Sequence, residues 1–353
     1  MDPGTQALLG GAVTQSFFGK KLGRKAFWWG AFAAALPDLD ILLGNPKDPT
    51  HTWIYHRGFT HALWFEIVFG MVLGFLVWKF YNWHWGSPKK PLKTWMALFI
   101  LALLSHPLLD VLTPYGTQLF APFSRARFAI NAMPIIDPVY TLILFLGLFL
   151  AAFFRKNPNK KVFITSIALI LSTFYLFFAF FLNEKAKSVA KHQLQSEGVQ
   201  NYQIKSYPTI FQIFLRRVVV QTPDEIRIAF ITLWDPRYSK RKIPWKSFRP
   251  PKHLGIDQIK QTKMGTVFTW FAMEQIFGKI FRENQKLRVE LHDLRYGIDG
   301  PPDQSLWGIY SYFDPKKQKI GDVKKFYIPR EKSFREEVIK LLASTFILPN
   351  EET

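Results

Sequence analysis

The first half of the chain is a series of long apolar runs separated by short polar or basic segments. A membrane-spanning helix needs about 20 mostly apolar residues, and four runs come close to that length. They cover Ala62 to Tyr81, Thr94 to Leu112, Val139 to Phe154 and Val162 to Leu182. We therefore predict four membrane-spanning helices in this half of the chain.

Two earlier segments are ambiguous. Thr5 to Phe18 is short, glycine-rich and weakly apolar, whereas Ala26 to Leu43 is apolar but contains Pro37-Asp38-Leu39-Asp40 near its end. Each can cross the membrane obliquely, or enter it and be shielded by the other helices. The basic cluster Lys20 to Lys25 follows the first apolar stretch rather than preceding it, unlike a cleaved secretory signal. We therefore expect the start of the chain to be retained.

The pattern changes after Asn183, where the long apolar runs stop. Short alternating segments on either side of a polar turn predict a β-hairpin over residues 217–233. Two more strand-rich stretches cover 287–296 and 305–313, and helical periodicity returns at 268–281 and 333–348. The expected fold is mainly α: a polytopic helical membrane domain, residues 1–183, followed by a soluble α+β domain, residues 184–353.

Composition supports a membrane protein, because 48% of the residues are hydrophobic and 17% are aromatic. There is no cysteine, which excludes disulfides, thiolate ligands and thiol nucleophiles. The formal net charge of +20 would indicate nucleic acid in a soluble protein. Here basic loops beside anionic lipid headgroups are the better interpretation. We expect membrane lipids as partners and no nucleic acid.

The orientation of the spans follows from two basic connections. Lys79 to Lys93 and Arg155 to Lys161 lie on the same side of a four-span arrangement. The positive-inside tendency assigns that side to the cytoplasm. The ionisable residues discussed below and the C-terminal domain would then face outward, most simply from a cell's inner membrane. Arg125 and Arg127 count modestly against this topology, because they fall on the outer side.

Ionisable residues stand where the apolar runs begin and end. His106 and Asp110 are four residues apart, so they share one face of a helix. Two ligands of one metal, or a ligand and its supporting carboxylate, require this arrangement. The alternative is a hydrogen-bonded His–Asp pair that joins two helices. A charged residue inside a span costs about 2.5–3.5 kcal/mol on insertion scales, so such groups are usually paired or functional.

Two further motifs carry ligand-type side chains. His56-Arg57-Gly58-Phe59-Thr60-His61 contains two imidazoles, which suit zinc, and Arg57 can hold a phosphate or carboxylate with its planar fork. This segment can equally be a wet interfacial loop. The carboxylates of Asp38 and Asp40 can bridge cations or supply a ligand and a base. They can also cap a helix or form a turn.

Asp137, which precedes Pro138, is either a helix N-cap or part of the same site. In the predicted topology all these groups fall near one membrane boundary, where they suffice for a mononuclear or dinuclear centre that activates water. The predicted metal ligands are Asp40, His56, His61, His106, Asp110 and, as ligand or supporting group, Asp137. The predicted catalytic residues are Asp38, as base or bridging carboxylate, and Arg57, which would bind a substrate anion. Zinc is the expected divalent metal, with manganese or magnesium as alternatives.

Several ordered motifs resemble those of a family of membrane-bound proteins described as metal-dependent hydrolases. They are Met1–Gln6, Leu36–Asp40, His56–His61, Ser105–Asp110, Thr113–Gln118, Pro122–Ser124, Arg127–Ala129, Ile135–Pro138 and Asp293–Gly297. That family is distantly similar to zinc-dependent phospholipases C and single-strand nucleases, whose His-x-x-x-Asp element is similar to His106 and Asp110. Many relatives have His where this chain has Gln6, a poorer zinc ligand. The resemblance implies a helical membrane enzyme with clustered metal ligands.

The expected function is therefore divalent-metal-dependent hydrolysis of a phosphoester in a lipid or another membrane-associated substrate. Two alternatives stay open. The His/Asp cluster can be structural in a scaffold that binds a partner protein, or His106 and Asp110 can relay a proton or cation in a transporter. The late motif is also ambiguous, because Asp293 and Arg295 can reach over the site or form an internal ion pair.

Overall fold

The computed structural model describes residues 1–43, 45, 48, 50–85, 90–234, 242–297 and 305–327. The chain divides into two compact units. The first comprises Met1–Pro46 and Tyr55–Phe178, and the second comprises Lys47–Ile54 and Ala179–Thr353. Helix α7 (Pro158–Ser196) contributes residues to both units, and the predicted domain boundary after residue 183 falls within it.

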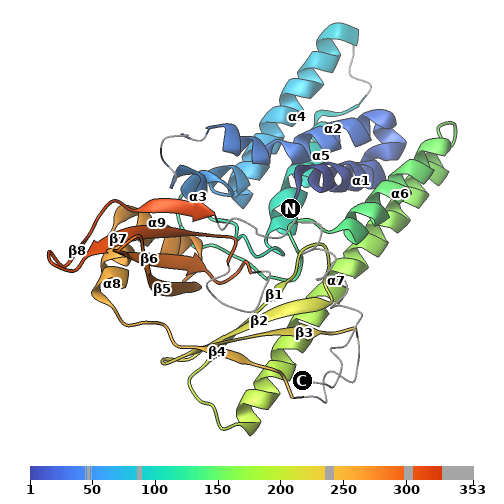
Figure 1. The fold of residues 1–353 in the computed structure, drawn as a ribbon. Coiled ribbons are helices and arrows are strands. Elements are labelled where there is room, and N and C mark those ends of the chain that lie inside the picture. Colours follow the sequence, from blue (N-terminus) through green and yellow to red (C-terminus); the bar gives the residue numbers. More distant parts are fainter. Residues whose placement is uncertain are drawn as a thin grey trace. The chain divides into compact units, whose positions relative to one another are not determined.

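The first unit is helical (Figure 1). Besides the start of α7, its helices are α1 (Pro3–Leu22), α2 (Arg24–Ala35), α4 (Leu63–Trp85), α5 (Leu92–Asp110) and α6 (Pro138–Phe153), with the short 3₁₀ segments η1 (Pro37–Leu43) and η2 (Phe59–His61). Helix α1 begins where Asp2 accepts a hydrogen bond from the Thr5 backbone N–H. It ends at Gly23, whose φ of +61° suits glycine.

Glycines allow the helices of the first unit to approach closely. A Cβ at Gly30 would lie 2.6 Å from the carbonyl oxygen of Gly10, so α1 and α2 touch backbone to backbone there. A Cβ at Gly70 would lie 2.8 Å from the Ile100 nitrogen, and one at Gly74 would lie 2.5 Å from the Met96 Cα. Small residues give apolar helices large contact areas by this route. The close α1–α2 and α4–α5 pairs therefore form the frame that carries the site.

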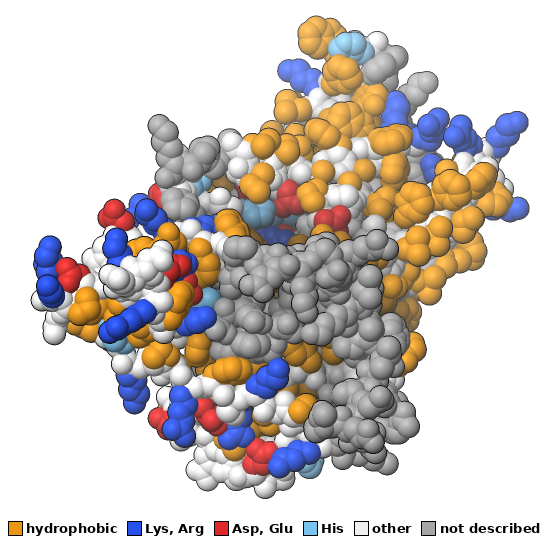
Figure 2. All heavy atoms as spheres, in the orientation of Figure 1, with side chains coloured by type: hydrophobic (Ala, Val, Ile, Leu, Met, Phe, Trp, Pro, Cys, Tyr) orange, Lys and Arg blue, Asp and Glu red, His pale blue; other side chains and the backbone are white. Residues whose placement is uncertain are grey.

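Among the described residues, three helical segments are long and apolar enough to cross a membrane. They are Leu63–His84, Leu92–Asp110 and Pro158–Ser196. The predicted spans at 62–81, 94–112 and 162–182 fall largely on them, whereas the stretch predicted at 139–154 forms the shorter apolar helix α6. Figure 2 shows hydrophobic side chains gathered where Figure 1 places α4 and α6. This confirms a helical membrane region at the start of the chain.

The second unit is α+β, with two antiparallel sheets. One sheet has the order β1 (Gln203–Pro208), β2 (Leu215–Gln221), β3 (Ile226–Thr232) and β4 (Lys246–Phe248). The other has the order β5 (Ile276–Glu283), β6 (Lys286–Asp293), β7 (Trp307–Asp314) and β8 (Lys319–Ile320), and β9 (Lys324–Tyr327) also pairs with β7. Helices α3 (His51–Tyr55), α8 (Leu254–Gln261) and α9 (Lys263–Phe271) complete the described elements. The β2–β3 pairing, with Val219 opposite Ile228, confirms the predicted hairpin.

One predicted helix is wrong over its second half. Residues 268–281 were expected to be one helix, but α9 ends at Phe271 and β5 begins at Ile276. Met273 and Glu274 both have positive φ values, which a continuing helix does not allow. The apolar residues that follow belong to strand β5, where successive side chains point to opposite faces, and not to one face of a helix. The helix predicted at 333–348 lies outside the described residues.

Candidate metal centre

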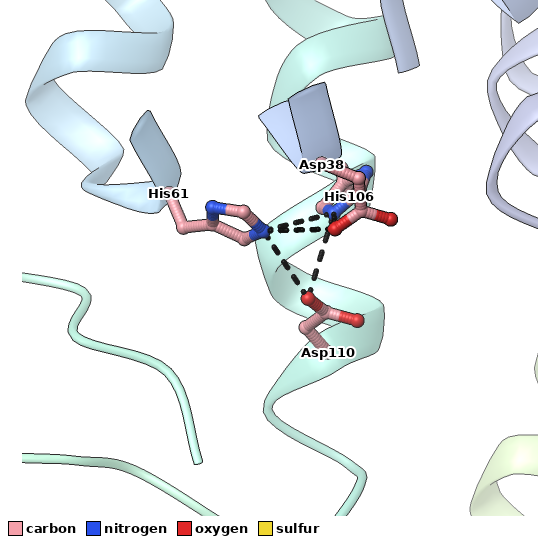
Figure 3. A group of neighbouring side chains, drawn as sticks. All are labelled: Asp38, His61, His106 and Asp110. Carbon is pink, nitrogen blue, oxygen red and sulfur yellow. Dashed lines mark hydrogen bonds and ion pairs between the residues drawn. The ribbon is translucent and has the colours of Figure 1, made fainter. Parts of the chain in front are cut away.

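Four predicted site residues converge in the first unit (Figure 3). Asp38 comes from η1, His61 ends η2, and His106 and Asp110 lie in the last turns of α5. The Nε2 atoms of the two histidines are 3.1 Å apart. Asp38 Oδ1 lies 3.5 Å from His61 Nε2 and 3.4 Å from His106 Nε2. Asp110 Oδ2 lies 3.5 Å from each of the same nitrogens.

These donor separations fit one tetrahedral ion. A tetrahedral zinc with bonds of about 2.0–2.1 Å holds its donor atoms about 3.3–3.4 Å apart. Five of the six donor separations run from 3.1 to 3.5 Å, and all four donor atoms, including those of Asp38 and Asp110, lie within 4.8 Å of one another. In addition, Asp110 Oδ2 is buried and accepts no aligned hydrogen bond from the described residues, although the Arg57 guanidinium lies beside it. The cluster could therefore hold a divalent metal ion.

Contacts at the Nδ1 atoms orient both histidine rings. The Nδ1 atom of His106 lies 2.6 Å from the Ala34 carbonyl oxygen at the end of α2. The Nδ1 atom of His61 lies 3.0 Å from Thr60 Oγ1 and 3.4 Å from Asp40 Oδ2. Hydrogen bonds at Nδ1 fix the ring and leave the Nε2 lone pair free for a metal. Both imidazoles thus present Nε2 to the cluster.

Asp40 is not one of the four donors but lies beside His61. It accepts hydrogen bonds from Thr60 Oγ1 at 2.7 Å and from the Arg57 backbone N–H at 3.2 Å, and His56 Nδ1 lies 2.7 Å from its other oxygen. Burial raises the pKa of the Asp40 carboxyl, but the hydrogen bonds to His56 and Thr60 and the charge of His61 outweigh burial and lower it. In this geometry Asp40 and His56 support His61 rather than join the four donors.

The exposed edge of the cluster is Asp38. Its side chain is 13% exposed, whereas the other three donors are fully buried. Burial raises the pKa of the Asp38 carboxyl, but hydrogen bonds to His106 and His61 hold the pKa far below its ordinary value. Asp38 is therefore ionised at neutral pH and is the donor that a substrate or water can reach.

Arg57 is held by the protein on several sides. Its Nη1 donates to Thr113 Oγ1 at 2.8 Å, its Nε lies 3.0 Å from Asp110 Oδ2 without hydrogen-bond alignment, and its guanidinium lies 4.7 Å from the Tyr115 ring centroid. The backbone φ of Arg57 is +58°, an uncommon conformation for a long side chain. Strain of this kind persists only where the surrounding contacts enforce it. The structure thus places a positive charge directly beside the cluster.

Other residues at the site could be recognised only partly from the sequence. Gln6 donates to Asp110 Oδ1 at 2.9 Å, and the Met1 amino group forms an ion pair with the same oxygen. Glu66 was not predicted at all. It is fully buried, and neither of its carboxylate oxygens has a hydrogen-bond partner among the residues that the structure describes. An acid inside an apolar run was the signal that could have revealed it.

Glu66 lies close to His106 by helix register. It is one turn before Gly70 and two turns before Gly74, which pack on Ile100 and Met96 of α5. Extending this antiparallel register brings Glu66 to the level of residue 104. That level is two residues from His106. Glu66 is therefore a buried acid in the α4–α5 interface just behind the candidate site.

Asp137 lies outside the four-donor group. It caps α6 by accepting a hydrogen bond from the Tyr140 backbone N–H at 2.9 Å, and Tyr175 Oη donates to it at 3.0 Å. In the second unit, Asp293 and Arg295 form an internal ion pair at 2.7 Å, and both are buried. Asp293 accepts from Arg295 through both carboxylate oxygens. The late motif therefore contributes to the interior of the second unit.

Comparison with known proteins assigns the first half of the chain to a family. Residues 1–186, just over half of the chain, match the model of the YdjM inner membrane protein family. The chain is also similar to a protein of Bacillus subtilis (strain 168) described as uncharacterized protein YfhP, with 25% identity over 140 residues. This match covers 40% of each chain, and no solved structure matches. The matched family segment contains all four donors of the cluster. The chain therefore belongs to the YdjM inner membrane protein family.

Proposed function

We propose that this protein is a membrane-embedded hydrolase that uses one divalent metal ion, zinc in the first instance, to cleave a phosphoester. The observation that carries the proposal is the set of four His and Asp donors at tetrahedral spacing, one of them exposed. Structural zinc sites are closed, whereas catalytic ones keep a position for water. Three buried donors would hold the ion, and the partly exposed Asp38 would leave the fourth position to water, which is the catalytic type.

The roles of the residues follow from their burial. His61, His106 and Asp110 are buried and would hold the ion, which would supply a hydroxide-like nucleophile near neutral pH. Asp38 Oδ1 faces the same point and would accept the proton from the attacking water. Arg57 would add positive charge beside Asp110 as negative charge develops on the phosphoester. Asp40 would keep His61 in the required orientation.

The position of the site in the helices supports a membrane-associated substrate. His61 lies two residues before α4 begins at Leu63, and α5 ends at Asp110. Because α4 and α5 run antiparallel, these two ends lie at the same end of both candidate spans. The site then lies near one membrane boundary, where lipid headgroups carry phosphoesters. The positive-inside pattern of the basic connections favours the outer boundary.

Elemental analysis of the detergent-purified protein is the first test. The wild-type chain should carry about one equivalent of zinc, manganese or iron, and an H106A/D110A variant should carry none. Asp137→Asn is the matched control, because it changes a buried acid outside the cluster and should keep the metal. A folded wild-type protein that neither contains nor takes up metal would refute the proposal.

Activity is tested with phosphoester lipids in mixed micelles. Asp38→Asn should retain the metal, since three buried ligands remain, but lose most of the turnover because the base is gone. General-base catalysis contributes typically about 10²–10⁴-fold, so the loss should fall in that range. Loss of metal in this variant would instead make Asp38 a ligand.

Transport is a second candidate, favoured by Glu66. A fully buried acid with no hydrogen-bond partner, close to His106 in a candidate span, is the kind of group found in proton and cation pathways. This reading predicts pH-dependent flux into vesicles and no hydrolysis. The flux should be abolished by Asp110→Asn and by Glu66→Gln.

A further inference from the structure

Four aromatic side chains near the site are exposed although they are apolar. Phe59, Trp64, Phe120 and Phe123 are 43%, 36%, 49% and 83% exposed, respectively. The Trp64 ring lies 5.3 Å from that of Phe59 and 6.0 Å from that of Phe123, measured between centroids. Phe120 precedes Phe123 by three residues, and its ring lies 5.5 Å from that of Phe128. We call Phe59, Trp64, Phe120 and Phe123 the aromatic ledge. Exposed apolar groups of this size that cluster together indicate a surface that something else covers.

The aromatic ledge is tied to the turn that carries His61. Trp64 Nε1 donates to the Ala121 carbonyl oxygen at 2.7 Å, and the Leu63 backbone N–H donates to Leu119 at 3.0 Å. The Gln118 backbone N–H donates to the Arg57 carbonyl oxygen at 2.9 Å. Phe59 is itself two residues from His61. The aromatic ledge and the metal-site turn therefore form one structural piece.

The aromatic ledge continues the lipid-facing side of α4. Trp64 lies on the same helix face as Ile67, Val68 and Met71, because residues three, four and seven apart share a face. These three side chains are exposed and belong to a candidate membrane span. Tryptophan is enriched where such a span meets the headgroups. If this candidate span crosses the membrane, lipid covers the rest of this face, so lipid is also the simplest cover for the aromatic ledge.

The sequence beyond the aromatic ledge turns polar within two residues. Phe123 is followed by Ser124 and then by the exposed Arg125. An aromatic side chain in the acyl region followed by a cation at headgroup level is the order expected along a membrane boundary. This order of side chains fits a position at the boundary between the acyl chains and the headgroups.

We propose that the aromatic ledge is immersed in the leaflet where headgroups meet acyl chains. The substrate is then a bilayer lipid whose acyl chains stay in the membrane during cleavage. The second half of this inference rests on the proposed function. The immersion itself does not, because it depends only on the exposed aromatic cluster and on its continuity with α4.

Immersion is tested with nitroxide labels on single cysteines in the full chain. The chain contains no cysteine, so each variant carries one label. In phosphatidylcholine/phosphatidylglycerol vesicles, a label at Phe123→Cys should collide more often with oxygen than with a water-soluble nickel chelate. Phe75→Cys, within α4, is the lipid control, and Arg125→Cys is the water control. A Phe123→Cys label that resembles the Arg125→Cys label, or that neither reagent reaches, would overturn the proposal.

The substrate half is tested by the activity of Phe123→Ser. Turnover of phosphatidylglycerol in vesicles should fall at least fivefold, whereas turnover of a soluble chromogenic phosphodiester should not change. Equal losses on both substrates, or none, would refute the assignment of a bilayer lipid. If the wild-type chain hydrolyses neither substrate while the Phe123→Cys label is immersed, the proposed function fails and the aromatic ledge stands.

Discussion

Replacing Asp40 by Asn tests whether this carboxylate supports the metal centre or belongs to it. Asp40 receives His56 and His61 on its two oxygens, together with the Thr60 hydroxyl and a backbone N–H. Asparagine keeps the shape but offers one acceptor oxygen instead of two. The substitution therefore leaves at least one buried donor without an acceptor, and the ring of His61 loses its negative partner.

The magnitude follows from this geometry. Losing a carboxylate that orients a metal-bound histidine typically costs about 10–100-fold in metal affinity. Each tenfold loss corresponds to about 1.4 kcal/mol, so the expected cost is about 1.4–2.8 kcal/mol. Removing a proposed ligand such as His106 would cost far more.

The measurement is a competition titration of zinc between the purified protein and a chromogenic chelator. Asp40→Asn should weaken the affinity by one to two decades and leave one metal equivalent at saturation. Asp48→Asn is the control and should not change the zinc affinity. It changes a carboxylate in the second unit that accepts a hydrogen bond from the Thr50 backbone N–H. Complete loss of the metal would make Asp40 a ligand, and unchanged affinity would show that it does not support His61.

Three further predictions concern stability. Gly30→Val should lower the free energy of unfolding by about 1–3 kcal/mol, seen as a lower thermal midpoint, because its Cβ would lie 2.6 Å from the Gly10 carbonyl oxygen. Asp293→Ala should cost about 3–5 kcal/mol in denaturant unfolding, because the charge of Arg295 stays buried without the Asp293 carboxylate; a cost under about 1 kcal/mol would contradict the ion-pair assignment. The pKa of Asp40 is lowered in the fold, so its contribution to stability should be complete above about pH 4 and be lost as pH falls through the lowered value. Thermal midpoints between pH 2 and 6 should fall less steeply in Asp40→Asn than in the wild type.

Much of the fold follows from periodicity. The apolar runs predicted three of the described candidate spans, and the polar turn between alternating segments predicted the β2–β3 hairpin. The failure at 268–281 has a local cause. Two consecutive residues with positive φ end the helix after Phe271, and neither Met273 nor Glu274 signals this by type.

The site was predictable to the extent that helix geometry decides it. His106 and Asp110 had to share a face of α5, and the structure places both in the cluster. The roles of the two η1 carboxylates, Asp38 and Asp40, could not be predicted, because their spacing in the sequence does not show which one points towards the Nε2 atoms of the cluster. A 3₁₀ segment has about three residues per turn, so Asp38 and Asp40 point in different directions, one to the Nε2 atoms and the other to Nδ1 of His61.

The charges around the cluster connect its geometry to its substrate. Asp38 and Asp110 contribute two negative charges, and Arg57 contributes one positive charge within contact distance of Asp110. A divalent ion added to these three charges would make the site net positive. An anion is then the ligand that the site attracts most strongly. The same charge balance would suit a phosphoester whose negative charge grows during attack, and it would disfavour a neutral ester of equal size.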